Sequence, residues 1–195
     1  KYSMPEYLVE KWKAAYGVKT TEKILEDFLT ERPITVRCRT HKASLKEIVT
    51  SLKAQGVTVQ QAPYLPYALK ISDYNHILTL DAFLQGKILV QDISSMLVAE
   101  AASQKKGDYI IDMCAAPGGK SIHAADKMGD YGNVDARDVS QYKADLIKEN
   151  IHRTGVINVD AKVQDATVYD PDSEQAADIV IADVPCSGYG VIGKK

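Results

Sequence analysis

The residues best suited to chemistry lie in a glycine-containing loop between an apolar strand and a helix. The run Asp112-Met-Cys-Ala-Ala-Pro-Gly-Gly-Lys120 follows a strand expected at 109–113 and precedes a helix expected to reach about 128. In open α/β sheets, ligands bind outside the carboxyl ends of strands, beside the N–H groups that begin a helix. Two adjacent glycines let a ligand approach the backbone closely. The loop therefore predicts a binding site with the candidate residues Cys114, Ala115, Ala116, Pro117, Gly118, Gly119 and Lys120.

Two phosphate-binding motifs match this loop only in part. The dinucleotide pattern GxGxxG is absent. The pattern GxxxxGK[ST] is matched at its end by Gly119-Lys120-Ser121, but Cys114 stands where its first glycine belongs. A tight turn without a ligand is a further alternative. A short glycine turn followed by spaced acids fits a nucleoside without phosphates best.

Aspartates end the four strands expected in the second half of the chain. Asp138 could accept hydrogen bonds from two ribose hydroxyls, and Asp165 could accept one from an adenine amino group. One such aspartate is often only a helix cap. Four around one cleft favour a shared site; they are Asp112, Asp138, Asp165 and Asp183.

A cysteine follows proline in the run Asp183-Val-Pro-Cys-Ser-Gly188. A thiol needs a cationic or helix-terminal environment to become a thiolate at neutral pH. Beside a cofactor loop, Cys186 is a candidate nucleophile or acid/base group, although a small buried turn residue is the plainer alternative.

The second half of the chain alternates strands with helices. Strands expected at 109–113, 133–137, 159–163 and 178–183 are separated by helices, which predicts a doubly wound parallel sheet with helices on both faces. Asp135 and Arg137 share one face of a strand that should be apolar on both sides. Pairing with each other would accommodate them.

The first half predicts a helical segment at 1–32 and a small α+β module at 33–89. Trp12 is expected to anchor a pair of short helices. Residues 34–39 alternate apolar and polar side chains, so Arg37 and Arg39 are expected on the outer face of a strand, with Cys38 in the core. A helix opening at Ser44 and strands at 57–60 and 68–72 complete the module. The third segment, 90–195, contains the parallel sheet.

Composition narrows the class of protein. The 195 residues are 45% hydrophobic and 26% charged, with no apolar run long enough for a membrane span. Three cysteines without a CxxC pair predict neither disulfides nor a cysteine-rich zinc site and indicate a reducing, cytoplasmic compartment. The four histidines are scattered, so no metal is expected. Residues 1–89 carry 13 Lys and Arg against 9 Asp and Glu, whereas 90–195 carry 11 against 17. A basic first part is compatible with RNA binding and equally with an ordinary solvated surface.

Together these motifs resemble the Sun-type (nucleolar protein/Sun) RNA cytosine-C5 methyltransferases, including the bacterial 16S ribosomal RNA methyltransferase B group. The resemblance rests on the loop 110–120, the strand-end aspartates and the Pro-Cys motif. It extends upstream to Tyr2–Trp12, Arg32–Arg37 and Val90-Gln-Asp-Ile-Ser-Ser95, nearly the whole chain. It implies a Rossmann-like fold and S-adenosylmethionine as cofactor, with no membrane or metal partner.

The resemblance also implies roles for individual residues. Residues 114–120 would line the methionine and ribose side of the cofactor, Asp138 would hold the ribose, and Asp165 would meet the adenine. Asp183 would face both the methionine end and the target base. In the family a cysteine of a later Thr-Cys-Ser motif is the nucleophile, and the Pro-Cys residue, here Cys186, assists product release. Candidate contacts to RNA phosphates are Arg37, Arg39, Lys42 and Lys46.

The sequence departs from the family at its ends. It stops at Lys195, before a Thr-Cys-Ser segment, so we expect a fragment with a partial sheet that is not catalytically competent by itself. The strand at 178–183 should then form an apolar edge that invites self-association. Two alternatives remain open: a non-catalytic module that binds S-adenosylmethionine or RNA, and a cytosine-C5 methyltransferase whose nucleophile is Cys186.

Overall fold

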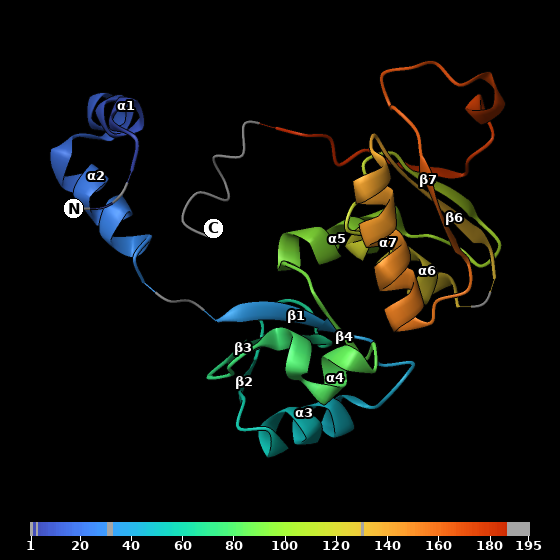
Figure 1. Cartoon of the computed structure of the whole chain (residues 1–195), viewed down its shortest axis with the longest axis horizontal. Helices are drawn as coiled ribbons and strands as arrows, with labels where there is room; N and C mark the ends of the chain where they lie inside the picture. The colour runs from blue at the N-terminus through green and yellow to red at the C-terminus, as the bar shows by residue number, and fades with distance from the viewer. Residues whose placement is uncertain (1, 3, 31–32, 130, 187–195) are drawn as a thin grey trace. The chain divides into compact units, whose positions relative to one another are not determined.

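The computed structural model describes residues 2, 4–30, 33–129 and 131–186. The chain divides into two compact units, one of Lys1–Arg32 with Pro185–Lys195 and one of Pro33–Val184. Figure 1 shows the course of the chain through these elements. Among the described residues, no helix combines the length and apolar character needed to cross a membrane.

The N-terminal unit contains two short helices, α1 (Glu6–Tyr16) and α2 (Val18–Asp27). The Trp12 and Phe28 rings lie 5.8 Å apart between centroids, and Leu8 and Leu25 are buried. The prediction that Trp12 anchors this helix pair is confirmed.

The second unit begins with a four-stranded antiparallel sheet. Its strands are β1 (Ile34–Cys38), β2 (Thr58–Gln61), β3 (Ala68–Ser72) and β4 (Ile88–Val90), in the order β2-β3-β1-β4. The sequence did not predict β4, because three residues are too few to show a periodic pattern. Strand β4 pairs with β1 and places the following residue, Gln91, beside the second sheet's helices.

One face of this sheet packs on helices α3 (Leu45–Ala54) and α4 (Asp81–Leu84), with the 3-10 turn η1 (Ile77–Thr79) nearby. Helix α3 begins with a complete capping box: the Ser44 hydroxyl accepts from the Glu47 N–H, and the Glu47 carboxylate accepts from the Ser44 N–H. Val36, Ile48 and Leu52 are fully buried in the core between sheet and helices.

The second sheet is parallel, and its strands lie on both sides of the first one, β5 (Tyr109–Asp112). Its strands are β5 (Tyr109–Asp112), β6 (Asn133–Asp138), β7 (Val159–Val163) and β8 (Ile179–Ile181), in the order β7-β6-β5-β8. From β5 the chain first proceeds outward through β6 and β7, then returns to the other side of β5 as β8. The strand order therefore reverses between β5 and β8, and such a switch point is where open α/β sheets bind ligands.

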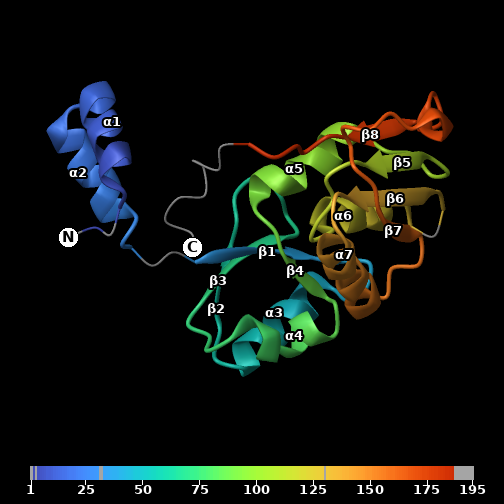
Figure 2. The same ribbon diagram turned by 45° about the horizontal axis from the view of Figure 1, so that its top comes forward.

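Within the described residues, three helices cover one face of the parallel sheet: α5 (Ile93–Ala102), α6 (Gly119–Met128) and α7 (Gln141–Thr154). Figure 2 shows them beside strands β5 to β8. The other face carries the segment after β7 with the 3-10 turn η2 (Pro171–Ser173). The expected helices are thus observed on one face of the described sheet, and the other face has only this short turn.

The polar pair in β6 behaves as the sequence predicts. Arg137 Nη2 lies 2.6 Å from Asp135 Oδ2, and Arg137 also contacts Asp170 and Ser173 of the segment that crosses this face. Because each charge has a partner, the pair is tolerated in a buried strand.

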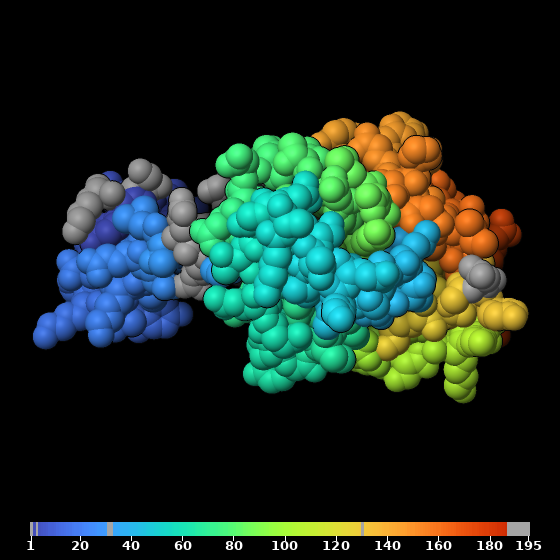
Figure 3. Space-filling view, turned by 90° about the horizontal axis from the view of Figure 1, so that it is seen from below, coloured from blue at the N-terminus to red at the C-terminus, as the bar shows by residue number. Residues whose placement is uncertain are grey.

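The two sheets belong to one compact unit, and their surfaces meet along a continuous boundary in the space-filling view (Figure 3). The outer face of β1 lies against α6, where Asp126 accepts hydrogen bonds from Arg37 Nη1 at 2.7 Å and from Arg39 Nη2 at 2.6 Å. Arg37 and Arg39 are only 2% and 1% exposed. The prediction that these arginines lie on an exposed face and contact RNA phosphates is wrong, because α6 covers that face and supplies their counter-ion.

Candidate active site

The loop that links β5 to α6 forms the floor of the site at the switch point. Its backbone is fixed by the Ala115 N–H, which donates to the Arg137 carbonyl at 2.8 Å. Gly118 has a positive φ of 98°, and a β-carbon there would lie 3.2 Å from Ile147 Cγ2. As the N-cap of α6, Gly118 offers no side-chain acceptor to the first turn. The first-turn amides of α6 are therefore not capped by a side chain at that position, as expected of a helix end that receives a ligand.

Asp112 supplies a buried acceptor at the carboxyl end of β5. Its Oδ2 accepts from the Ser121 hydroxyl at 2.6 Å, whereas its Oδ1 is buried without a partner. Burial raises the pKa of Asp112 to about 6, despite the opposing effects of Ser121 and Lys120. An unpaired carboxylate oxygen in a buried site is costly unless something positive approaches it. The sulfonium and ammonium groups of S-adenosylmethionine have the required charge, so this position fits the expected cofactor.

Asp138, at the end of β6, ties that strand to the loop. Its carboxylate accepts from the N–H groups of Ala116 at 3.0 Å and Val139 at 2.8 Å, and Lys143 Nζ lies 3.0 Å away. Burial opposes ionisation, but these hydrogen bonds and the lysine outweigh it, and the pKa of Asp138 falls below its usual value. Asp138 is therefore an ionised acceptor next to the loop. Its contact with a ribose stays a prediction.

Lys120 and Asp183 meet across the switch point. Lys120 Nζ, in the first turn of α6, lies 2.5 Å from Asp183 Oδ2, in the segment after β8. The Asp183 side chain is 56% exposed and Lys120 only 18%. A largely buried lysine thus holds an accessible carboxylate beside the start of α6.

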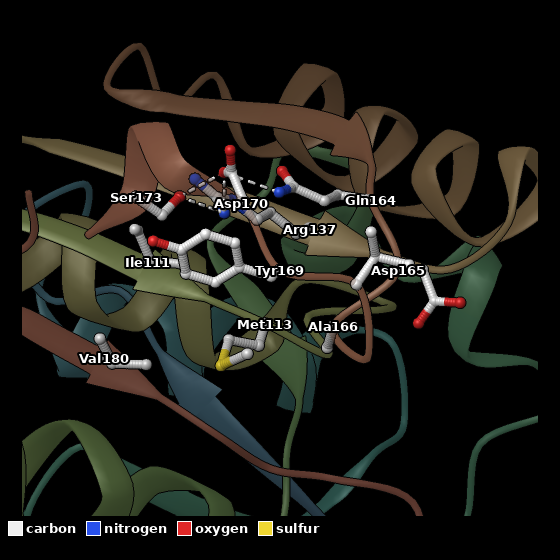
Figure 4. A pocket seen from close by; sticks show the side chains of 11 residues that line it. Ile111, Met113, Arg137, Gln164, Asp165, Ala166, Tyr169, Asp170, Ser173 and Val180 are labelled. Carbon is white, nitrogen blue, oxygen red and sulfur yellow. Dashed lines mark hydrogen bonds and ion pairs between the residues drawn. The ribbon is translucent and has the colours of Figure 1, made fainter.

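Asp165 borders a cavity of about 280 Å³ on the sheet face opposite the helices (Figure 4). Its own Oδ1 accepts from the N–H and hydroxyl of Thr167. The cavity combines apolar side chains of β5 and β8 with a polar wall around Arg137; its lining residues are Ile111, Met113, Arg137, Gln164, Asp165, Ala166, Val168, Tyr169, Asp170, Ser173 and Val180. Asp165 is exposed at its rim, and its contact with adenine stays a prediction.

The two candidate cysteines differ in their surroundings. Cys114 is half-buried in the loop, where burial and the charge of Asp138 raise the pKa of its thiol. A thiol in such a setting is a poor nucleophile. Cys186 is exposed and is grouped with the N-terminal unit. Its catalytic role therefore stays a prediction.

Two of the four residues expected to contact RNA remain accessible. Lys42 and Lys46, before and within α3, are exposed, in contrast to Arg37 and Arg39. Their phosphate contacts stay a prediction.

The structural roles of two residues between the sheets were not recognised from the sequence. Asp126 is the partner of both buried arginines, and the Gln91 side chain lies beside the first residue of α6. Asp126 follows Ala124 and Ala125 on the buried side of α6, and an acid at such a position is the one signal that could have revealed it.

The fold and the site together define a class: a parallel Rossmann-like α/β domain with a glycine loop and strand-end aspartates at its switch point, preceded by an antiparallel α+β module. Two family models match the chain. One, described as 16S rRNA methyltransferase RsmB/F, covers residues 99–195, and another, described as the ferredoxin-like domain of RsmF/B-like methyltransferases, covers residues 4–77. The chain belongs to the RsmB/F family of rRNA cytosine-C5 methyltransferases.

Individual relatives agree with this assignment. A probable ribosomal RNA small subunit methyltransferase B of Bacillus subtilis is 37% identical over 99% of the chain and 43% of its own length. The human 28S rRNA (cytosine(4447)-C(5))-methyltransferase is 30% identical over 99% of the chain and 24% of its own length. The solved structure of PH0851 is 33% identical and has a TM-score of 0.87; the match covers 99% of the chain and 44% of the length of PH0851. The chain thus spans less than half the length of these relatives.

Proposed function

We propose that the whole protein transfers a methyl group from S-adenosylmethionine to C5 of a cytosine in ribosomal RNA. The observation that carries this proposal is the Lys120–Asp183 ion pair across the switch point, beside the unpaired buried oxygen of Asp112. Family membership supplies the reaction type, and the site supplies residues that suit it.

The residues around the loop would hold the cofactor. Residues 114–120 would line its methionine and ribose side, with the first-turn amides of α6 facing its polar groups. Asp138, ionised at neutral pH, would accept from the ribose hydroxyls, and Asp165 from the adenine amino group. When bound, S-adenosylmethionine supplies an electrophilic methyl group on a sulfonium.

The catalytic roles proposed for this part of the protein belong to Asp183 and Cys186. Asp183, held by Lys120, would orient the target base by accepting a hydrogen bond from it. Cytosine must leave any base stack to reach such a cleft. Cys186 would assist product release. In the alternative, Cys186 is itself the nucleophile. The complete protein and its Cys186→Ala variant are each incubated with a 5-fluorocytosine substrate, which traps the covalent complex. Loss of the trapped complex in Cys186→Ala would favour the alternative.

Cofactor binding is tested by calorimetric titration of the chain with S-adenosylmethionine or S-adenosylhomocysteine. We expect Asp138→Ala to weaken binding at least about tenfold, because a charge-assisted hydrogen bond contributes roughly 1.5–3 kcal/mol. Asp145→Ala, which removes an exposed carboxylate of α7, is the matched control and should bind as the unchanged chain does. No binding by the unchanged chain would contradict the proposal.

RNA binding is tested by the salt dependence of affinity. Lys42→Ala with Lys46→Ala should reduce the slope of log K against log salt by about 0.7 for each single-strand phosphate that the protein no longer neutralises. Lys53→Ala, in the last turn of the same helix α3, is the control. Equal slopes for all variants would remove these lysines from the RNA-binding surface.

The expectation that the 195-residue chain is inactive by itself also stays a prediction. Incubation with ribosomal RNA and cofactor carrying a labelled methyl group tests it: label in the RNA would show that this chain suffices.

A further inference from the structure

Gln91 lies against the first residue of the helix that begins at the cofactor loop. It follows β4, and its side chain is buried, with the residue 6% exposed. A β-carbon added to Gly119 would meet Gln91 Cδ at 3.8 Å, so the amide lies beside the start of α6, with room for only a methyl group between them. Gln91 therefore lies between the antiparallel module and the start of α6, next to the cofactor loop.

Arg37 fixes the Gln91 amide. Arg37 Nε donates to Gln91 Oε1 at 2.9 Å, and both groups are buried. Because a guanidinium only donates, the amide oxygen must face Arg37 and the amide nitrogen must point elsewhere.

The same guanidinium also contacts α6 directly. Arg37 Nη1 donates to Asp126 Oδ2 at 2.7 Å. Asp126 lies seven residues after Gly119, about 10 Å along the helix axis. Arg37, a residue of β1, thus contacts α6 directly at Asp126 and fixes Gln91 beside its first turn.

The cluster is not arranged for stability alone. Gln91 Nε2 and Arg37 Nη2 are both buried with no hydrogen-bond partner in the described structure. Unsatisfied buried donors cost free energy, and two in one cluster call for an explanation. A fixed orientation of Gln91 against Gly119 provides one.

We propose that Arg37 and Gln91 are positioning residues: they hold the first turn of α6, and hence the cofactor loop, in the geometry that binds the cofactor. Because Arg37 belongs to the antiparallel module, that module is then a part of the cofactor site's support. This inference rests on the proposed function for its ligand.

The test compares Gln91→Leu, Gln91→Glu and Arg37→Lys with the unchanged 195-residue chain. Leucine keeps the bulk but removes the acceptor of Arg37 Nε, whereas glutamate keeps it. Gln61→Leu is the matched control, because Gln61 Nε2 donates to three carbonyls within its own module, those of Ala62, Leu65 and Ala68.

The first readout is calorimetric affinity for S-adenosylhomocysteine. We expect binding to weaken about tenfold in Gln91→Leu and Arg37→Lys, a change equivalent to about 1.4 kcal/mol. Gln91→Glu should stay within about threefold of the unchanged chain, and Gln61→Leu should bind equally well even if its unfolding midpoint falls. Unchanged affinity in Gln91→Leu, or a loss in Gln91→Glu as large as in Gln91→Leu, would overturn the proposal.

The second readout needs no ligand. Hydrogen exchange of the backbone amides in 115–123 should accelerate in Gln91→Leu and Arg37→Lys but not in Gln61→Leu. If the unchanged chain fails to bind S-adenosylhomocysteine, the proposed function fails. Exchange then still decides whether Arg37 and Gln91 hold the loop, and equal rates in every variant would refute that role.

Discussion

At the scale of single residues, the packing of the antiparallel module on the parallel-sheet domain decides whether a charged side chain is buried in an ion pair or exposed. Arg37 and Lys42 lie five positions apart in the same module, yet one is buried against Asp126 and the other is exposed. Asp126 resists protonation: burial would raise its pKa, but hydrogen bonds and charge from Arg39 and Arg37 lower it. The ion pair therefore persists through the neutral range.

The burial of His123 leads us to expect that the free energy of unfolding depends on pH. It is 3% exposed on α6, and burial, aided by the charge of Arg37, lowers its pKa to about 3. In the unfolded chain a histidine takes up a proton near pH 6.5, whereas the folded chain keeps His123 neutral down to about pH 3. The free energy of unfolding is therefore undiminished above about pH 6.5 and falls as the pH drops below that value. Between pH 7.5 and 5.5, urea unfolding should show a fall in the free energy of unfolding that is about 1 kcal/mol larger in the unchanged chain than in His123→Gln.

A second histidine contributes to this measurement. Desolvation also lowers the pKa of His41, whose side chain is 46% exposed, so a smaller pH dependence should survive in His123→Gln. A His123→Gln chain with the full slope would show that the unfolding does not sense this residue.

At the scale of elements, α6 has three contacts with different partners. Its first turn faces the loop and Gln91, its buried side packs on the parallel sheet, and Asp126 accepts from β1. Strand β8 is an edge of the described sheet, and self-association through it stays a prediction.

Gly118→Ala should disturb the start of α6 more than backbone strain alone explains. A β-carbon at the positive φ of 98° would lie 3.2 Å from Ile147 Cγ2, whereas Gly107, at φ 95°, has open space around it. Both alanines carry left-handed strain of roughly 1–2 kcal/mol. Chemical denaturation should show a further loss of about 1 kcal/mol in Gly118→Ala only, with weaker binding of S-adenosylhomocysteine. Equal losses in the two variants would argue against a tight fit at Gly118.

At the scale of the whole molecule, the two sheets of the second unit are joined by polar contacts to main-chain atoms. Arg39 Nη1 donates to the carbonyls of Gly86 and Thr154, and Arg153 Nη1 donates to the Phe83 carbonyl. The turn before β4 therefore lies directly on the end of α7.

Gly86→Ala should push the turn before β4 away from the end of α7. Its β-carbon would lie 2.4 Å from the Arg153 carbonyl oxygen and 2.6 Å from Thr154 Cα, both backbone atoms, while Gly56, also at positive φ, has nothing within 4 Å. Urea denaturation should show a loss of about 3 kcal/mol or more in Gly86→Ala and about 1 kcal/mol in Gly56→Ala. Equal losses in the two variants would show that the contact between Gly86 and the end of α7 can move apart at little cost in free energy, contrary to this prediction.

The sequence by itself determined the secondary structure of most elements and the cofactor loop. Apolar spacing predicted the parallel strands and their helices, and the glycine turn with its strand-end aspartates predicted a site at the carboxyl edge, because both signals are local. The Asp135–Arg137 pair was also predictable, since the two residues share one face of one strand.

Only the tertiary structure decided the roles of Arg37, Arg39, Asp126 and Gln91. Alternation shows that a strand has a polar face, but it does not show what covers that face. Strand β1 and helix α6 are almost ninety residues apart in the chain, and the burial of the arginines depends on their docking. The charge that makes this burial possible comes from that distant helix.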